Sequence, residues 1–312
     1  MNYTFSASVK EDDKQRAAFN KLTSQTFGFD FRDWYDAGHW GNLYIPHTLF
    51  DGDKAISNVS VNLMQFQIGD ERKNYIQLGT VMTDEAYRGQ GLNRWIMERV
   101  LEEYAGKVDG IYLFGNDSVL DYYPRFGFQP AKEYEYYLTE EQLAAAGECQ
   151  LEKVDMSQPE KCECLYDMIS SCAASESPNP NDGMYMNENL NLYQFWMTAG
   201  YGDNVYYLPE KDVYVIAELD GQVLRIHQIF GKNQVDIAGV AKELVKELVK
   251  EAELADAGRT AITEVVLGFT PAHKELFSVR EHKEEDCTLF VLGEDLQRVE
   301  REKLMFPVLS HA

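Results

Sequence analysis

The chain has 312 residues, of which 45% are hydrophobic, so it is long enough for two folded units with buried cores. Its formal net charge of −23 argues against nucleic acid and anionic membrane surfaces as partners and favours a cationic ligand. Apolar runs stay well below the roughly 18 residues of a membrane span, and the first residues carry no basic segment ahead of an apolar one. We therefore expect a cytoplasmic protein.

The cysteines and histidines give no sign of a metal site. The five cysteines are an odd number and unevenly spread, which fits a reducing compartment. Cys162 and Cys164, with Cys149 and Cys172 nearby, lack the paired two-residue spacings of a zinc site, and the six histidines form no His-x-x-x-His pair. No metal is expected.

The first half of the chain predicts helices that alternate with strands. Helical spacing of apolar residues covers 11–26, a short stretch at 31–35, and later 91–105 and 118–125. Strand patterns occupy 43–50, 55–68, 74–83 and 110–115, and a turn at Asp51-Gly52-Asp53 joins the first two. A last strand at 134–138 is expected to close this sheet. The polar, alanine-rich stretch at 139–150 then predicts a domain boundary.

The second half repeats this order of elements. A strand at 151–154, a helix at 162–172 and a loop at 175–183 lead to a helix at 187–198. Strands follow at 204–208, 213–219 and 223–230, then a helix at 236–256 with a continuous apolar stripe, and strands at 261–267 and 287–292. The sequence thus predicts an α/β fold in two tandem units, residues 1–145 and 146–312.

One glycine-containing run lies between a predicted strand and a predicted helix, Arg88-Gly89-Gln90-Gly91-Leu92-Asn93. Glycines let a backbone approach a ligand closely, and the first amides of a helix have no partner inside the helix. Such a turn suits a phosphate-bearing cofactor. A dinucleotide fingerprint would need a third glycine where Arg94 stands, and a P-loop would need Gly-Lys-Ser/Thr, which is absent.

What remains resembles the coenzyme A loop of the GNAT acetyltransferase superfamily, Arg/Gln-x-x-Gly-x-Gly/Ala. Arg88, Gly91 and Asn93 occupy its three defined positions, the last with an asparagine where a small residue is usual. A second family signature follows the strand 110–115, with Asn116 and then Tyr122-Tyr123-Pro124-Arg125-Phe126-Gly127-Phe128. The resemblance covers roughly residues 43 to 138 and implies a mixed, mostly antiparallel twisted sheet flanked by helices.

The resemblance also implies a reaction, acetyl transfer from acetyl-CoA to a primary amine by direct attack. Tyr123 would protonate the leaving thiolate, because a phenol with a pKa near 10 is protonated at neutral pH. Asn116 would hold the cofactor arm, although it could equally cap a short helix near Ser118. Backbone groups along the pantetheine arm and the diphosphate would supply the other cofactor contacts: Val81, Met82, Thr83, Arg88, Gly89, Gln90, Gly91, Leu92 and Asn93. The Arg88 side chain would either add a charge-assisted contact or remain a solvated surface group.

The second half looks like a degenerate copy of the same fold. In place of the cofactor loop it reads Phe230-Gly231-Lys232-Asn233-Gln234-Val235-Asp236, with one glycine and an acidic residue that would repel a diphosphate. We expect this copy not to bind coenzyme A, but to wall the acceptor pocket and stabilise the first copy. One competent and one degenerate module resemble tandem acetyltransferases, including aminoglycoside-modifying ones of the enhanced-intracellular-survival type.

Two functions stay open at this point. The first is acetyl transfer to a small-molecule or peptide amine, with a longer acyl group as a variant, and the second is a non-catalytic acyl-CoA sensor or scaffold. The general base is unassigned, because the family uses an acidic side chain, water chains or, in some tandem enzymes, the chain-terminal carboxylate. The apolar tail at 306–312 is compatible with insertion into a site, but docking on the second half or an untethered end is the favoured interpretation.

Overall fold

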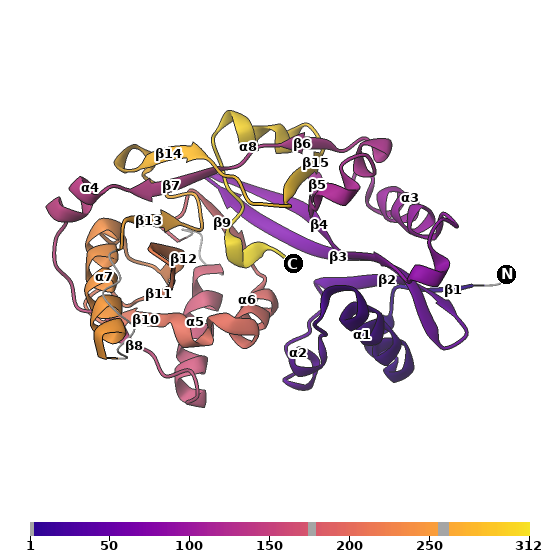
Figure 1. The fold of residues 1–312 in the computed structure, drawn as a ribbon, viewed down its shortest axis with the longest axis horizontal. Coiled ribbons are helices and arrows are strands. Elements are labelled where there is room, and N and C mark those ends of the chain that lie inside the picture. Colours follow the sequence, from indigo (N-terminus) through magenta and orange to yellow (C-terminus); the bar gives the residue numbers. More distant parts are fainter. Residues whose placement is uncertain (1–2, 174–178, 255–261) are drawn as a thin grey trace.

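The computed structural model describes residues 3–173, 179–254 and 262–312, in which two β-sheets lie side by side with helices outside them (Figure 1). The elements of the first half are β1 (Thr4–Ser6), α1 (Asp13–Phe27), α2 (Arg32–Asp36), β2 (Tyr44–Asp51), β3 (Lys54–Ile68), β4 (Glu71–Thr83), α3 (Leu92–Tyr104), β5 (Gly110–Gly115), β6 (Gln129–Ala131), β7 (Tyr134–Leu138) and α4 (Glu140–Ala145). Those of the second half are β8 (Glu152–Lys153), α5 (Pro159–Ala173), β9 (Met184–Asn187), α6 (Leu190–Trp196), β10 (Val205–Leu208), β11 (Val213–Asp220), β12 (Val223–Gly231), α7 (Ile237–Leu254), β13 (Glu264–Leu267), β14 (Ser278–Glu281), β15 (Thr288–Leu292) and α8 (Arg298–Arg301).

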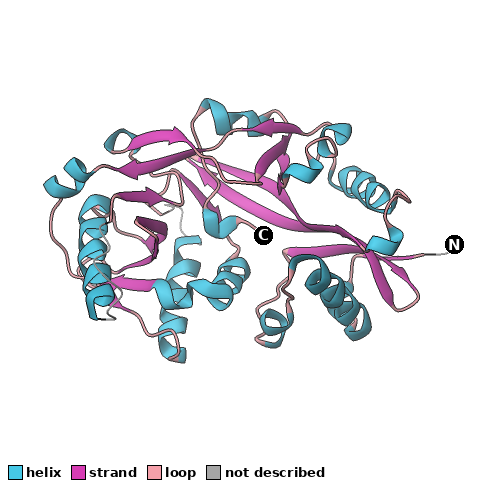
Figure 2. Cartoon of the chain, in the orientation of Figure 1, coloured by secondary structure: helices cyan, strands magenta, loops and turns pink. Residues whose placement is uncertain are grey.

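The first sheet runs in the order β1-β2-β3-β4-β5-β15-β6, and β9 pairs with β3 outside this path. β2, β3 and β4 are antiparallel neighbours, whereas β4 and β5 are parallel and joined by α3 as a crossover helix. α3 covers one face of the sheet, and α1 and α2 cover the other (Figure 2). The strands serve both faces: Val59 and Ile76 pack with Ile96 of α3, while Phe50 packs with Phe19 of α1.

The second sheet repeats this arrangement in the order β14-β7-β13-β12-β11-β10-β8. β10, β11 and β12 are successive antiparallel neighbours, and α7 crosses over to β13, which runs parallel to β12. The apolar stripe of α7, with Val240, Ala241 and Leu244, lies in one core cluster with Leu224 and Val265 of the two parallel strands. The prediction of two tandem α/β modules, each with a mixed, mostly antiparallel sheet flanked by helices, is confirmed.

The two halves exchange strands, since the second half gives β15 as well as β9 to the first sheet and the first half gives β7 to the second sheet. Here the sequence-based prediction was wrong. β7, expected to close the first sheet, lies in the second between β13 and β14. β15, expected in the second module, lies in the first sheet between β5 and β6. An apolar strand pattern shows that faces are buried but does not show which edge the strand pairs with. The boundary near residue 145 divides the chain into two halves, but each sheet contains strands from both halves. As a division into folding units, the boundary stays a prediction.

Local structure departs from prediction at two more places. Two short 3-10 turns, Asp117–Val119 and Tyr123–Phe126, replace the helix expected at 118–125. Strand β9 was not predicted, and the helix expected from 187 begins at Leu190. Parts of the predicted elements, residues 175–178, 255, 256 and 261, lie outside the described residues. Within the described ranges, every helix is too short or too polar to cross a membrane.

Candidate functional site

The turn between β4 and α3 has the backbone that its glycines predict. Gly89 and Gly91 have φ of +76° and +74°, in the left-handed region that costs other residues about 1–2 kcal/mol. Both are exposed, and a β-carbon at either would meet no atom within 4 Å. Across the described residues, no hydrogen bond occupies the backbone amides at 89–94, and the first helical bond joins the Trp95 amide to the Gly91 carbonyl at 3.0 Å. An open row of amides at a helix N-terminus is a site for an anion.

Asn93, which replaces a small residue of the family loop, points into the protein rather than into this turn. Its Nδ2 donates to the carbonyl of Asn58 at 3.0 Å and to that of Met82 at 3.5 Å. Its Oδ1 accepts from the Tyr122 hydroxyl at 2.7 Å. The longer side chain therefore ties α3 to β3 and β4 and leaves the exposed face of the turn clear.

Arg88 lies at the outer edge of the turn. Its Nε donates to the Thr83 carbonyl at 3.3 Å, and its Nη1 lies 3.5 Å from a carboxylate oxygen of Glu85. More than half of each of the two charged side chains is exposed, so the ion pair contributes little to stability. The guanidinium stays available at the surface beside the free amides.

The parallel strands β4 and β5 separate next to this turn. Their pairing ends at Gln77 and Tyr112, and beyond these residues β4 and β5 do not pair with each other. A bulge in β4 marks the divergence, with Thr80 at φ 41° and its hydroxyl bonded to Ser60 Oγ at 2.6 Å. Such a free strand edge can pair with the amides of a linear ligand.

Of the three residues predicted to line the cofactor arm, only Val81 faces a cavity at this point. Met82 is buried, and its carbonyl also accepts from Ser57 Oγ at 3.2 Å. The hydroxyl of Thr83 bonds the same Ser57 at 2.9 Å. The predicted strand is therefore in place, while two of its members are already engaged with β3.

Tyr123 lies beside the separated strands, almost fully buried. Its ring contacts Phe290 of the exchanged strand β15, with ring centroids 5.3 Å apart. Burial raises the pKa of the Tyr123 phenol, so the group stays protonated at neutral pH. Of the two adjacent tyrosines, Tyr122 has its hydroxyl bound to Asn93, whereas Tyr123 borders a cavity.

Asn116 caps the turn that follows β5. Its Oδ1 accepts from the Ser118 amide at 3.1 Å and from the Ser118 hydroxyl at 2.6 Å. The sequence left this cap open beside a cofactor role, and the cap is present. Asn116 also borders the same cavity as Val81 and Tyr123.

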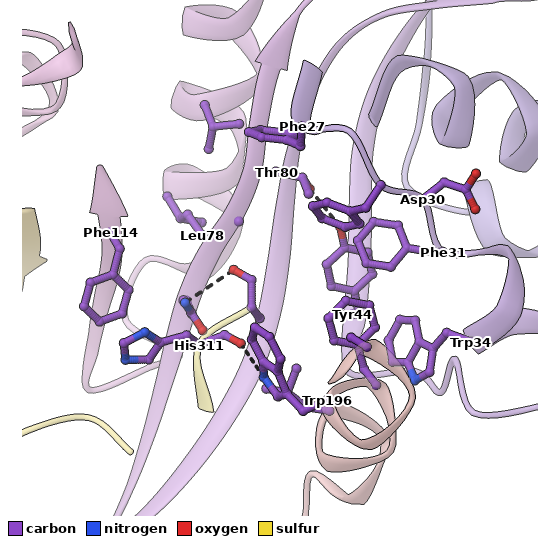
Figure 3. A pocket seen from close by; sticks show the side chains of 18 of the residues that line it. Phe27, Asp30, Phe31, Trp34, Tyr44, Leu78, Thr80, Phe114, Trp196 and His311 are labelled. Carbon is purple, nitrogen blue, oxygen red and sulfur yellow. Dashed lines mark hydrogen bonds between the residues drawn. The ribbon is translucent and has the colours of Figure 1, made fainter. Parts of the chain in front are cut away.

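That cavity holds about 720 Å³ and lies between the two modules. Figure 3 shows Phe31, Tyr44 and Trp34 along one side, Trp196 below, and Phe114 with His311 on the opposite side. Its lining comes from β4 and β5, from the segment joining α1 to α2, and from α6 and the tail: Phe27, Phe29, Asp30, Phe31, Asp33, Trp34, Tyr44, Gln77, Leu78, Gly79, Thr80, Val81, Phe114, Gly115, Asn116, Val119, Tyr123, Leu192, Phe195, Trp196, Thr198, Ala199, His311 and Ala312. The second module thus walls the pocket, as predicted.

Sequence reasoning placed Phe27 in the first helical pattern and Phe31 and Trp34 in a short helix, and it missed their place in the cavity. Five aromatic side chains within nine residues, from Phe27 to Tyr35, were the available signal. α6 completes this wall: Trp34 Nε1 donates to the carbonyl of Asn191 at 2.8 Å, and the Trp34 and Phe195 rings lie 5.6 Å apart. This wall can be identified only once the two modules are placed together.

The tail docks on the second module, where the Val308 amide donates to the Gly268 carbonyl at 2.8 Å, and its last two residues line the cavity. The His311 ring stacks on Phe114 at 4.0 Å, and the His311 carbonyl accepts from Trp196 Nε1 at 3.0 Å. Ala312 lies against β4, where its oxygen accepts from Gln77 Nε2 at 3.4 Å, and a β-carbon on Gly79 would come within 2.7 Å of that oxygen. Burial lowers the pKa of the His311 imidazole to about 4, so the ring is neutral at pH 7.

The comparisons with known proteins agree with this geometry. Residues 9–131 match a model of the acetyltransferase (GNAT) domain. This part of the chain is similar to the GNAT acetyltransferase domain. The search of curated proteins finds no match.

Solved structures share the GNAT fold across nearly the whole chain, second module included. The GCN5-related N-acetyltransferase of Kribbella flavida matches with 15% identity and a TM-score of 0.55, over 93% of this chain and 70% of that one. That of Anabaena variabilis matches with 13% identity and a TM-score of 0.56, over 93% and 72%. A conserved protein of Enterococcus faecalis matches with 14% identity and a TM-score of 0.59, over 97% and 74%. At these identities the likeness shows the fold alone.

Proposed function

We propose that the protein transfers the acetyl group of acetyl-CoA to a primary amine by direct attack. One observation carries this proposal: the open turn with free amides adjoins separated strands, and the cavity at those strands contains a protonated, unengaged Tyr123. The amides at 89–94 bind the diphosphate, the free edge of β4 holds the pantetheine arm from Val81 onward, and the thioester reaches the cavity.

The chemistry follows from this placement. The amine nitrogen attacks the thioester carbonyl, the C–N bond forms and the C–S bond breaks, with the thiolate as leaving group. Tyr123 gives its proton to that thiolate and is reprotonated from solvent. The ammonium form of the acceptor must first lose a proton, and the attacking nitrogen loses a second one to solvent as the amide forms. Besides the tyrosines, the titratable side chains that border the cavity are Asp30, Asp33 and His311.

Two measurements test this proposal together. Release of free thiol from acetyl-CoA, followed across monoamines, polyamines, amino sugars and peptides, should identify at least one acceptor whose product is an amide by mass spectrometry. Titration calorimetry with acetyl-CoA should show binding in the absence of any acceptor. Lack of acetyl-CoA binding would contradict the proposal at its first step.

A non-catalytic acyl-CoA sensor or scaffold is the alternative. The same free amides would serve a sensor, and the ties of Asn93 to β3 and β4 would hold its loop equally well. Tight acetyl-CoA binding without turnover on any acceptor would favour the sensor.

A further inference from the structure

Two large aromatic side chains stand exposed at the rim of the cavity. Phe27 and Phe29 are 46% and 42% exposed. They lie next to each other, with ring centroids 6.2 Å apart, and Phe29 makes edge contact with Phe31 at 5.4 Å. Clustered exposed apolar rings that border a cavity are typical of a binding surface for a ligand with an apolar part.

The polar atoms of three other aromatic side chains, Trp34, Trp196 and Tyr44, are already used within the protein. The Trp34 indole donates to Asn191, and the Trp196 indole donates to the His311 carbonyl. The Tyr44 hydroxyl is bonded to Thr80 Oγ1 at 2.7 Å. These three residues therefore present ring faces rather than hydrogen-bonding groups, and along this wall a ligand rich in hydroxyls would not replace its bonds to water.

The charge of the cavity is negative. Asp30 and Asp33 border it, and among the described residues its lining contains no lysine or arginine. Arg32 Nη2 lies 2.8 Å from Asp30 Oδ2 and lowers the pKa of that carboxyl. The positive charge of Arg32 therefore largely cancels the negative charge of Asp30. Asp33 makes no ion pair with any described residue and can attract a cation, as the ring faces also can.

From these observations we infer that the acceptor is a cationic amine with an aromatic or branched alkyl body, rather than a polyhydroxylated amino sugar or a linear polyamine. The inference rests on the proposed function and specifies its acceptor. The apolar body lies against Phe27, Phe29 and Phe195, while the ammonium group enters under the influence of Asp33 and points towards the thioester. A long acyl chain on the cofactor would also fit the apolar lining, but it has no use for the two carboxylates. The negative charge of the cavity therefore favours a cationic amine as its occupant.

An acceptor panel tests this inference with acetyl-CoA as donor. The value of kcat/KM for 2-phenylethylamine should exceed those for glucosamine and spermidine by at least tenfold. A glucosamine or spermidine value that equals or exceeds it would overturn the inference and leave the proposed function standing. Absence of turnover on every acceptor, with acetyl-CoA still bound, would overturn both. Hexanoyl-CoA reacting at least tenfold faster than acetyl-CoA would assign the cavity to the acyl chain and overturn the inference.

Two variants locate the effect in the cavity. Phe29→Ala should raise KM for 2-phenylethylamine about fivefold to tenfold, the worth of one aromatic contact, and leave KM for methylamine unchanged. Leu276→Ala is the matched control, since Leu276 is a 60% exposed apolar side chain that does not line the cavity. Asp33→Asn should raise KM for both amines, more at low salt than at high salt. An equal effect of Phe29→Ala on both amines would contradict the assignment.

Tryptophan fluorescence gives a readout that does not depend on turnover. Trp34 and Trp196 border the cavity, so 2-phenylethylamine should change the emission in a saturable way, and methylamine should not. Phe29→Ala should weaken this binding by the same factor as it raises KM. No saturable change at concentrations that support turnover would count against the inference.

Discussion

The molecule has two crossover connections of the same topology, β4 to α3 and β12 to α7. They differ in the conformation of their glycines and in whether their backbone amides are free. The first contains two left-handed glycines, and the amides there have no partner within the described chain. In the second, Gly231 is buried, with Val213 in the way of any β-carbon at 2.4 Å, and the Val235 amide donates to Asn181 at 3.0 Å. Asp236 stands at the start of α7 and accepts the first helical bond there, from the Val240 amide.

The two modules also differ in what lies between their parallel strands where the pairing of these strands ends. β4 and β5 separate after Gln77 and open onto the cavity. β12 and β13 end their pairing at Ile226 and Leu267, and there the tail is bound, with the Val308 amide donating to the Gly268 carbonyl at 2.8 Å. One fold thus supplies a binding groove where its backbone groups are left free, and a structural core where the chain itself uses them.

Removal of the Tyr123 hydroxyl should have the largest effect. Tyr123→Phe should lower kcat by at least about 100-fold, the usual worth of a positioned proton donor, with the affinity for acetyl-CoA unchanged. Tyr136→Phe is the matched control in the second sheet, where the lost bond is to the Lys303 carbonyl at 2.9 Å. Steady-state kinetics with calorimetry of acetyl-CoA binding measure both. A Tyr123→Phe enzyme with normal kcat would remove this residue from the mechanism.

Acid should loosen the tail through His311. Its pKa falls from 6.5 to about 4 on folding, so below pH 6.5 the unfolded chain binds more protons than the folded one. Stability should therefore fall as the pH drops from about 6.5 towards 4. Between pH 7 and pH 5 this group should account for about 2 kcal/mol.

His311→Phe isolates that contribution, because it keeps a ring on Phe114 and removes the titrating group. Urea unfolding at pH 7 and pH 5 should show a loss of stability that is about 2 kcal/mol smaller in the variant than in the parent. The same loss in both proteins would show that other groups cause the acid sensitivity.

A matched pair of glycines separates the cofactor turn from ordinary turns. Gly91→Val and Gly221→Val both place a β-branched residue at positive φ, +74° and +61°, and each should cost about 1–2 kcal/mol of backbone strain. Gly91→Val alone should weaken acetyl-CoA binding, by roughly tenfold, because the turn no longer presents its amides. Calorimetry and thermal unfolding measure the two effects. Equal binding in both variants would contradict the role of the turn.

The two glycines that meet the tail should give the smallest effects. Gly79→Ala pushes on Ala312 at 2.7 Å and should lower kcat/KM roughly fivefold with little change in stability, since that end is exposed. Gly268→Ala crowds the His227 backbone and Val308, at 3.0 and 3.1 Å, and should cost about 1–3 kcal/mol of stability instead. The reverse pattern would mean that the tail is structural on the first-module side.

The cofactor side of the site was predictable because it depends on local backbone geometry. A left-handed turn needs glycine, as at Gly89 and Gly91, and the segment after the next strand brings Asn116 and Tyr123 to the same place. The order of strands and helices within each module was also predictable from periodicity and turn residues. Even the unusual Asn93 proved compatible, because its side chain is bound on the inner side of the turn.

The exchange of β7 and β15 and the aromatic wall were not predictable in this way. Strand pairing across more than 120 residues is decided by the whole tertiary structure, and the pattern of Thr288–Leu292 fits either sheet. Likewise Phe27 and Phe29 become part of a cavity only when α6 of the other module lies opposite. The acceptor side of the site therefore needed the structure.

The stoichiometry of acetyl-CoA binding tests the central claim most directly. The account predicts one molecule bound per chain by titration calorimetry, with affinity lowered by Gly91→Val and unchanged by Lys232→Ala in the second connection. Two molecules per chain, or a loss of binding in the Lys232→Ala variant, would contradict the assignment of a single cofactor site to the turn between β4 and α3.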